Sequence, residues 1–473
     1  MNSKEDALAK IRLLAGESKH EVQVMSEIMQ EKETYLGQFA RLEKRLTGNV
    51  QPWFHRTRKA AISHFAELGL PTTRHEEWRF TNLAPLTKIS FQPVADDELD
   101  GVTAESLEPF SFGGLDGTRL VFVNGRFSEE LSSIRPLHNG LQVGSLAAAL
   151  DSDRERVEPY LARHASYQDQ AFVALNTAFV EDGAFVYIPP GKVVEHPLHL
   201  LFLSTSLDEP KVSHPRNLIV VGDNSQVTIV ESYVGLDGGV YFTNAVTEVI
   251  AGQNAVIDHC KLQQESKKAF HIAMLAVHQD HGSNFTSHSI SLGGAFVRNN
   301  VNAKLDAEGV ECTLNGLYMA TGDQLVDNHT LIDHAQPHCN SHEVYKGVLD
   351  GKSKGVFNGK IIVRPDAQKT DAKQNNKNLL LSDQAVIDTK PQLQIYADDV
   401  KCTHGATIGQ LDNEAIFYLR SRGIGPEDAR NMLTSAFAND ILSRIKIDAV
   451  RTHLDAALLN WFQKAQEMKT ALS

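Results

Sequence analysis

A cysteine and a histidine stand two residues apart in the segment "IYADDVKCTHGATIG" (395–409), at Cys402 and His404. The segment predicts a strand that leads into a turn, and residues two apart on a strand point to the same face. A thiolate beside an imidazole suits zinc or iron, including iron–sulfur species. Two ligands cannot complete a tetrahedral site, so inorganic sulfide, distant residues or another chain would supply the rest. The alternative for Cys402 is a core cysteine without a chemical role.

A second group of possible ligands lies in "HAQPHCNSH", which contains His334, His338, Cys339 and His342. Histidines four residues apart would share one face of a helix, as zinc sites often use them. Pro337 interrupts such a helix, and in strands or turns these side chains would not converge. Surface and turn histidines are therefore the favoured interpretation, and a structural zinc site is the alternative.

The segment "GVLDGKS" (347–353) resembles a phosphate-binding loop but is one residue shorter than the motif requires. The backbone amides of that loop must surround a phosphate, so the shorter segment favours a simple turn. A G-x-S-x-G motif and a local cysteine-protease signature are both missing from the sequence. We therefore expect no enzymatic activity from this chain alone.

Composition limits the classes of function. The chain has 473 residues, 42% of them hydrophobic and 22% charged, which is typical of a soluble globular protein with a large core. A net charge of −13 argues against nucleic acid or an anionic membrane as partner. The N-terminus "MNSKEDALAKIRLLAGESKH" lacks an apolar secretory core, and four scattered cysteines do not form a disulfide framework. A cytoplasmic location is expected.

Helical patterns at both ends of the chain enclose a long β region. Helices are expected over 1–48 and 53–68, and again from Asp412 onward, where Asp412 can cap "NEAIFYLRSR". Between them, short β-branched runs alternate with Gly, Asn and Asp turns, and one helical insertion is expected near 155–182. The predicted divisions are an N-terminal helical region (1–117), a β core (118–411) and a C-terminal helical domain (412–473).

The β region is repetitive. Similar turns begin at Gly222, Gly252 and Gly282, and less regular ones follow at Gly309, Gly322 and Gly351. The first three turns are thirty residues apart. A strand-and-turn repeat of this length indicates a solenoid, in which each unit buries its apolar face by stacking on its neighbours. The predicted fold is mainly β, with a parallel β-helix core, and a β-sandwich is the alternative.

Several segments resemble the SufB/SufD family of iron–sulfur cluster assembly proteins. They are "FNGKIIV" (357–363), the block 368–412, "FYLRSRGI" (417–424), "LPTTRHEEWRFTNL" (70–83) and "SLGGAFVRNN" (291–300). The resemblance covers roughly residues 50–440, and the block 368–424 is its most specific part. Leu419 stands where SufB members have a cysteine, and "KCTHGAT" has the form found in SufD members, so the chain resembles the SufD branch. The long charged N-terminus departs from the usual pattern.

The resemblance implies a right-handed parallel β-helix and a set of partners. It implies a heterodimer with SufB through the C-terminal ends of the two β-helices, and the ATPase SufC docked on the C-terminal helical domain. Sulfur would come indirectly from a cysteine desulfurase system, and a transient iron–sulfur cluster would form in the complex, with no cofactor in the isolated chain. A homodimer is expected when SufB is absent, because exposed strand edges seek partners.

The resemblance also assigns residues. His404 matches an iron- or cluster-binding histidine at the SufB–SufD junction, and Cys402 matches the neighbouring interface cysteine. Tyr418, Arg420 and Arg422 are interpreted as contacts for SufC, with surface salt bridges as the alternative for the two arginines. The favoured function is a non-catalytic scaffold subunit. The alternatives are a β-helix polysaccharide lyase or hydrolase and a homo-oligomer with a zinc site at 334–342.

Overall fold

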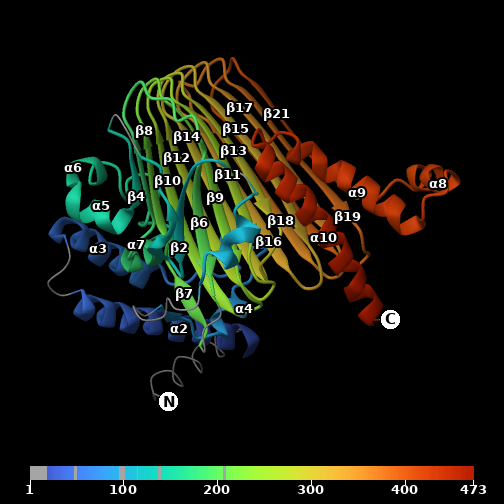
Figure 1. Ribbon diagram of the computed structural model, residues 1–473, viewed down its shortest axis with the longest axis horizontal. Helices are drawn as coiled ribbons and strands as arrows, with labels where there is room; N and C mark the ends of the chain where they lie inside the picture. The colour runs from blue at the N-terminus through green and yellow to red at the C-terminus, as the bar shows by residue number, and fades with distance from the viewer. Residues whose placement is uncertain are drawn as a thin grey trace.

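The computed structural model describes residues 19–46, 51–94, 102–113, 115–136, 140–205 and 209–472. Its centre is a parallel β-solenoid of about eight coils in this described part, with helices at both ends of the chain (Figure 1). The predicted fold class is therefore confirmed, and the β-sandwich alternative is wrong. Of the helix expected over 1–48, residues 1–18 and 47–48 lie outside the described residues.

Each coil gives one strand to each of two sheets. The first sheet pairs, in this order, β4 (Gln142–Ser145), β5 (Ala184–Ile188), β8 (Arg216–Val221), β10 (Tyr241–Ala251), β12 (Phe270–Gln279), β14 (Phe296–Leu305), β16 (Leu325–His334), β18 (Lys354–Val363) and β20 (Val386–Ile395), with β7 (Lys211–Ser213) beside β10 and β1 (Gln92–Pro93) beside β7. The second sheet pairs β3 (Arg126–Ser133), β2 (Thr118–Val123), β6 (Leu198–Ser204), β9 (Gln226–Gly235), β11 (Val256–Gln264), β13 (Asn284–Ser291), β15 (Glu311–Ala320), β17 (Asn340–Leu349), β19 (Asp371–Leu380) and β21 (Lys401–Gly409).

The repeated turns of the sequence are corners of successive coils. Asn224, Asn254 and Gly282 stack at one corner with φ of 55°, 54° and 62°, a left-handed conformation that asparagine and glycine adopt at low cost. The Asn254 side-chain amide donates to the Asn224 side-chain oxygen at 3.0 Å, which ties one coil to the next. The segment that resembles a phosphate-binding loop is another corner, where Gly351 has φ of 67°.

Helices cover the outer faces of both sheets. The described helices are α2 (Lys19–Arg45), α3 (Pro52–Leu68), η1 (Glu76–Trp78), α4 (Ala84–Thr87), η2 (Glu105–Phe110), α5 (Leu146–Ser152), α6 (Arg154–Val157), α7 (Ala171–Phe179), α8 (Asn413–Ser421), α9 (Pro426–Leu442) and α10 (Asp448–Leu472). Phe65 of α3 and Phe172 of α7 share a buried cluster with Phe242 of the first sheet. On the second sheet, Ile441 of α9 packs in a cluster with Leu262. No helix among the described residues combines the length and the apolarity that crossing a bilayer takes.

The two ends of the solenoid differ. At the N-terminal end, β3 pairs with β2 and β4 pairs with β5, both antiparallel, and close the sheets. At the C-terminal end, β20 and β21 form the last coil, and no described strand continues either sheet beyond them. The solenoid is therefore open at the end that carries the cysteine–histidine pair.

Candidate metal site at the open end of the solenoid

Cys402 and His404 both lie within the last strand, β21. The turn that the sequence predicted after them comes before them instead, at residues 396–400, where the chain passes from β20 to β21. The predicted boundary is therefore wrong, because the run "KCTHGATIG" pairs with β19 over its whole length. Within β21, successive side chains still alternate between the two faces of the strand, so Cys402 and His404 lie on the same face.

Both side chains face the interior of the solenoid. In the register of β19 and β21, Cys402 lies beside Ala372 and His404 lies beside Gln374, and side chains paired in this way share a face. Ala372 and Gln374 are buried inside the coil, at 0% and 3% exposed. Cys402 is half-buried against this interior, whereas His404 is exposed because no further coil covers it. The structure therefore brings the predicted pair together on one face.

Within the described part of the chain, the site is chemically incomplete. The described residues contain no group of three or more His, Cys, Asp or Glu side chains that could hold a metal ion. Burial raises the pKa of the Cys402 thiol, so a bound metal is needed to favour its thiolate form. A thiolate and an imidazole at an open strand edge thus supply part of a coordination shell, and other groups must supply the rest.

The second group of possible ligands does not converge. His334 is fully buried and its Nε2 lies 2.8 Å from Ser341 Oγ, while His338 is exposed at a corner with φ of 58°. Cys339 is buried and His342 is exposed on the outer face of β17. The structure therefore does not support the zinc alternative, because strand and corner geometry directs these side chains apart.

The three predicted partner contacts lie on or next to α8. Tyr418 and Arg420 are exposed, and Arg422, also exposed, donates from Nη2 to the Tyr418 hydroxyl at 3.3 Å. No residue of α8 is buried, and Figure 1 shows this helix standing away from the solenoid. The sequence analysis did not select Phe417, whose side chain is 74% exposed. An aromatic residue in a largely polar helix was the signal that could have identified it.

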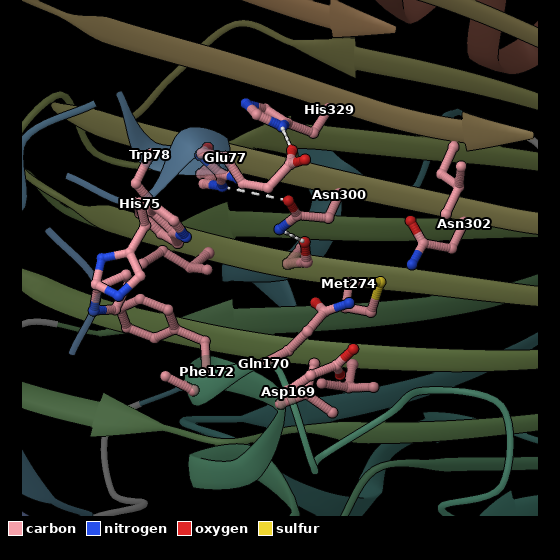
Figure 2. A pocket seen from close by; sticks show the side chains of 18 of the residues that line it. His75, Glu77, Trp78, Asp169, Gln170, Phe172, Met274, Asn300, Asn302 and His329 are labelled. Atoms are coloured by element: carbon pink, nitrogen blue, oxygen red, sulfur yellow. Dashed lines mark hydrogen bonds and ion pairs between the residues drawn. The ribbon is translucent and has the colours of Figure 1, made fainter. Parts of the chain in front are cut away.

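A cavity of about 350 Å³ lies between the outer face of the first sheet, residues 68–78 and residues 169–173 (Figure 2). Several of its charged groups form ion pairs: His329 Nδ1 lies 3.2 Å from Glu77 Oε2, and Arg298 lies 2.6 Å from Asp327. The Arg298 guanidinium also lies 3.8 Å from the centre of the Trp78 ring. These contacts fasten the "LPTTRHEEWRFTNL" segment to the sheet. The sequence analysis did not predict this cavity.

Comparisons with known proteins agree with this architecture. The family described as "SUF system FeS cluster assembly, SufBD core domain" matches residues 202–437, and the "SufBD protein N-terminal region" matches residues 29–200. An iron–sulfur cluster assembly SufBD family protein of Synechocystis is 38% identical over 84% of this chain and 88% of its own length. The iron–sulfur cluster assembly protein SufD of Escherichia coli is 31% identical over 86% of this chain and 96% of its own length.

A third relative, SufD of Bacillus subtilis, is 26% identical over 85% of this chain and 92% of its own length. These matches span both the helical N-terminal part and the solenoid, and they support a role in iron–sulfur cluster assembly. The chain belongs to the SufBD family of iron–sulfur cluster assembly proteins.

Proposed function

We propose that this chain is a non-catalytic scaffold subunit that binds iron and a nascent iron–sulfur cluster at a junction with a SufB-type partner. The observation that carries the proposal is the position of Cys402 and His404, side by side on the interior face of the last strand. Iron and sulfide are cargo here and not resident cofactors. A ligand set that one chain leaves incomplete suits a site that two subunits share.

The open end has the properties of an interface. Among the described strands, none pairs with the outer edge of the last coil. This coil also exposes apolar side chains at Val386, Ile395, Tyr396 and Ile408, whose exposed fractions lie between 41% and 63%. Unpaired edges and clustered apolar groups both favour association with another protein. A second solenoid end would cover these groups and supply the missing ligands. Without that partner, a second copy of this chain is expected to pair at the same edge.

A helical surface on α8 and α9 suits a second partner, and we propose that this partner is a SufC-type ATPase. Phe417 and Tyr418 on α8 and Met432 on α9 are 74%, 58% and 50% exposed. A helix of nine residues without a buried side chain is marginal on its own, so a bound partner would stabilise it. The sulfur would reach the junction from a cysteine desulfurase system that acts on the partner subunits.

The experiment that tests this function is anaerobic co-purification of the chain with SufB-type and SufC-type proteins from its own operon or genome, followed by iron and sulfide analysis. We expect a stable complex that yields more iron and sulfide than the SufB-type and SufC-type proteins prepared without this chain. If the chain forms no complex, or the metal content is equal in both preparations, the proposed function is wrong.

The α8 surface leads to a prediction about the ATPase partner. Replacing Phe417 and Tyr418 together by Ala is expected to weaken binding of the SufC-type protein at least about 30-fold, because buried aromatic anchors dominate interface energies. Binding measured by calorimetry checks this, and the thermal stability of the chain should not change, since both side chains are exposed. Leu459→Ala, an exposed apolar residue of α10, is the matched control. Equal losses in both variants would contradict the assignment.

A further inference from the structure

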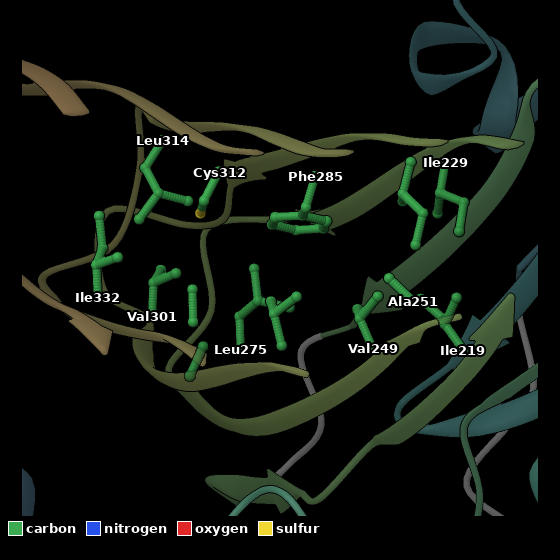
Figure 3. Packing of buried hydrophobic residues seen from close by; sticks show 14 of the residues in the cluster. Ile219, Ile229, Val249, Ala251, Leu275, Phe285, Val301, Cys312, Leu314 and Ile332 are labelled. Atoms are coloured by element: carbon green, nitrogen blue, oxygen red, sulfur yellow. The ribbon is translucent and has the colours of Figure 1, made fainter. Parts of the chain in front are cut away.

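Polar side chains line the interior of the solenoid directly behind His404. In the middle coils, apolar side chains such as Val301, Leu314 and Ile332, which Figure 3 shows, share the interior with buried polar ones such as His259 and Ser287. In the register of the second sheet, the row that contains Leu314 continues with Glu343 on β17, Gln374 on β19 and His404 on β21. The last three residues of this row, on β17, β19 and β21, are therefore all polar.

Glu343 is unusual among the buried glutamates of the described residues. The other three each have a cationic or imidazole partner: Glu248 lies 2.5 Å from Arg216, Glu231 lies 3.2 Å from His259, and Glu265 lies 2.8 Å from His271. Glu343 is 1% exposed, and within the described part of the chain it forms no ion pair. Burial raises the pKa of Glu343 to about 7, which is what a carboxyl group without a positive neighbour is expected to show.

Oxygen atoms without partners surround this carboxyl group. Gln374 donates from Nε2 to Glu343 Oε2 at 2.7 Å, and the Thr330 hydroxyl of the facing sheet lies close enough to lower the Glu343 pKa. Glu343 Oε1, Gln374 Oε1 and Thr330 Oγ1 are buried, and within the described residues none of them makes a hydrogen bond of regular geometry. Buried polar atoms without partners are rare, and each such atom is expected to have a ligand, a water or a functional role.

Gly359 of β18 faces Gln374, and a Cβ atom on it would come within 2.3 Å of Gln374 Nε2, so the glycine makes space for the Gln374 amide. A carboxylate, an amide carbonyl and a hydroxyl form an oxygen ligand set, which suits hard divalent cations. A divalent cation would also supply the positive charge that Glu343 lacks.

We propose that Glu343, Gln374 and Thr330 form an inner site for a divalent metal ion, which enters past His404 from the open end of the solenoid. This inference rests on the proposed function, since it gives the ferrous ion an oxygen-ligated position before it meets the thiolate and imidazole of Cys402 and His404. The two ligand sets differ in chemistry: oxygen ligands hold a hydrated hard cation, whereas sulfur and nitrogen retain iron that is about to bind sulfide.

The test uses Mn²⁺, a hard divalent cation that electron paramagnetic resonance can quantify, on the full chain alone and on its complex with the SufB-type partner. We expect one saturable site, weakened at least about tenfold by Glu343→Gln and changed less than about twofold by Cys402→Ser. Glu343→Gln removes a buried, unpaired charge at constant shape, so it should fold normally, as circular dichroism can check. Thr330→Val, close in shape to the native residue, should weaken Mn²⁺ binding in the same direction.

The outcomes separate this inference from the proposed function. If Mn²⁺ binding is missing, unaffected by Glu343→Gln, or lost equally in Cys402→Ser, the inner site is wrong. The proposed function is judged by different quantities, namely formation of the complex and its iron and sulfide content. An unchanged Mn²⁺ affinity in Glu343→Gln with a normal complex would overturn the inner site alone.

Discussion

Replacing Glu248 by Ala is expected to lower the free energy of unfolding by about 3–5 kcal/mol, because it leaves a buried guanidinium without its counter-charge. Glu248 and Arg216 are 0% and 1% exposed, and their closest atoms are 2.5 Å apart. The Glu248 carboxylate also accepts hydrogen bonds from four consecutive backbone N–H groups, those of residues 162–165, at 2.8–3.0 Å. Burial alone would raise the pKa of Glu248, but Arg216 and these donors outweigh it and hold the pKa below its usual value.

This pair fastens the helical insertion near 155–182 to the solenoid. Glu248 and Arg216 come from β10 and β8, and Arg216 Nη1 also donates to Asn176 Oδ1 and Thr177 Oγ1 of α7. Asp333→Asn is the matched control, because it removes an ion pair with Arg364 in the same sheet, where Arg364 is 54% exposed. That change is expected to cost less than about 1 kcal/mol. Urea unfolding of both variants measures the difference, and equal midpoints would contradict a structural role for Glu248.

The repeat and the corners could be predicted from the sequence because they depend on local chemistry. Turns thirty residues apart at Gly222, Gly252 and Gly282 are the corners of successive coils, where left-handed backbone needs asparagine or glycine. The helix at 53–68 is equally local, and the structure places α3 over Pro52–Leu68, ended at Gly69 with φ of 64°. Local rules of this kind transfer from sequence to structure without knowledge of the tertiary contacts.

The interior chemistry could not be predicted because it depends on register between coils. Glu343, Gln374 and His404 are separated by about thirty residues each, and only the pairing of β17, β19 and β21 places them in one row. In the sequence, Glu343 is one of many acidic residues, and its lack of a cationic partner is a property of the folded chain. The turn placed after Cys402 was wrong for the same reason, since pairing with β19 extends β21 through residues with weak strand signals.

Replacing His404 by Ala is expected to reduce the iron and sulfide recovered with the complex at least about tenfold, which is the loss typical of removing a group that orients or binds a metal. The amount of assembled complex should not fall, because the imidazole is exposed on the last strand and the chain folds without its support. Metal and sulfide analysis of the anaerobically purified complex, normalised to protein, gives the measurement. Wild-type values in this variant would show that the junction does not use His404.

The neighbouring residue supplies the matched control. Thr403 lies on the same edge strand, is exposed, and pairs with exposed Lys373, so its side chain faces outward and away from the interior row. Thr403→Ala therefore disturbs the strand edge as much as the His404 variant does, yet it should retain wild-type iron and sulfide. Cys402→Ser should lose iron as well, and the half-buried position of this side chain predicts a small loss of stability in addition. A loss shared by the Thr403 and His404 variants would assign the effect to the interface and not to coordination.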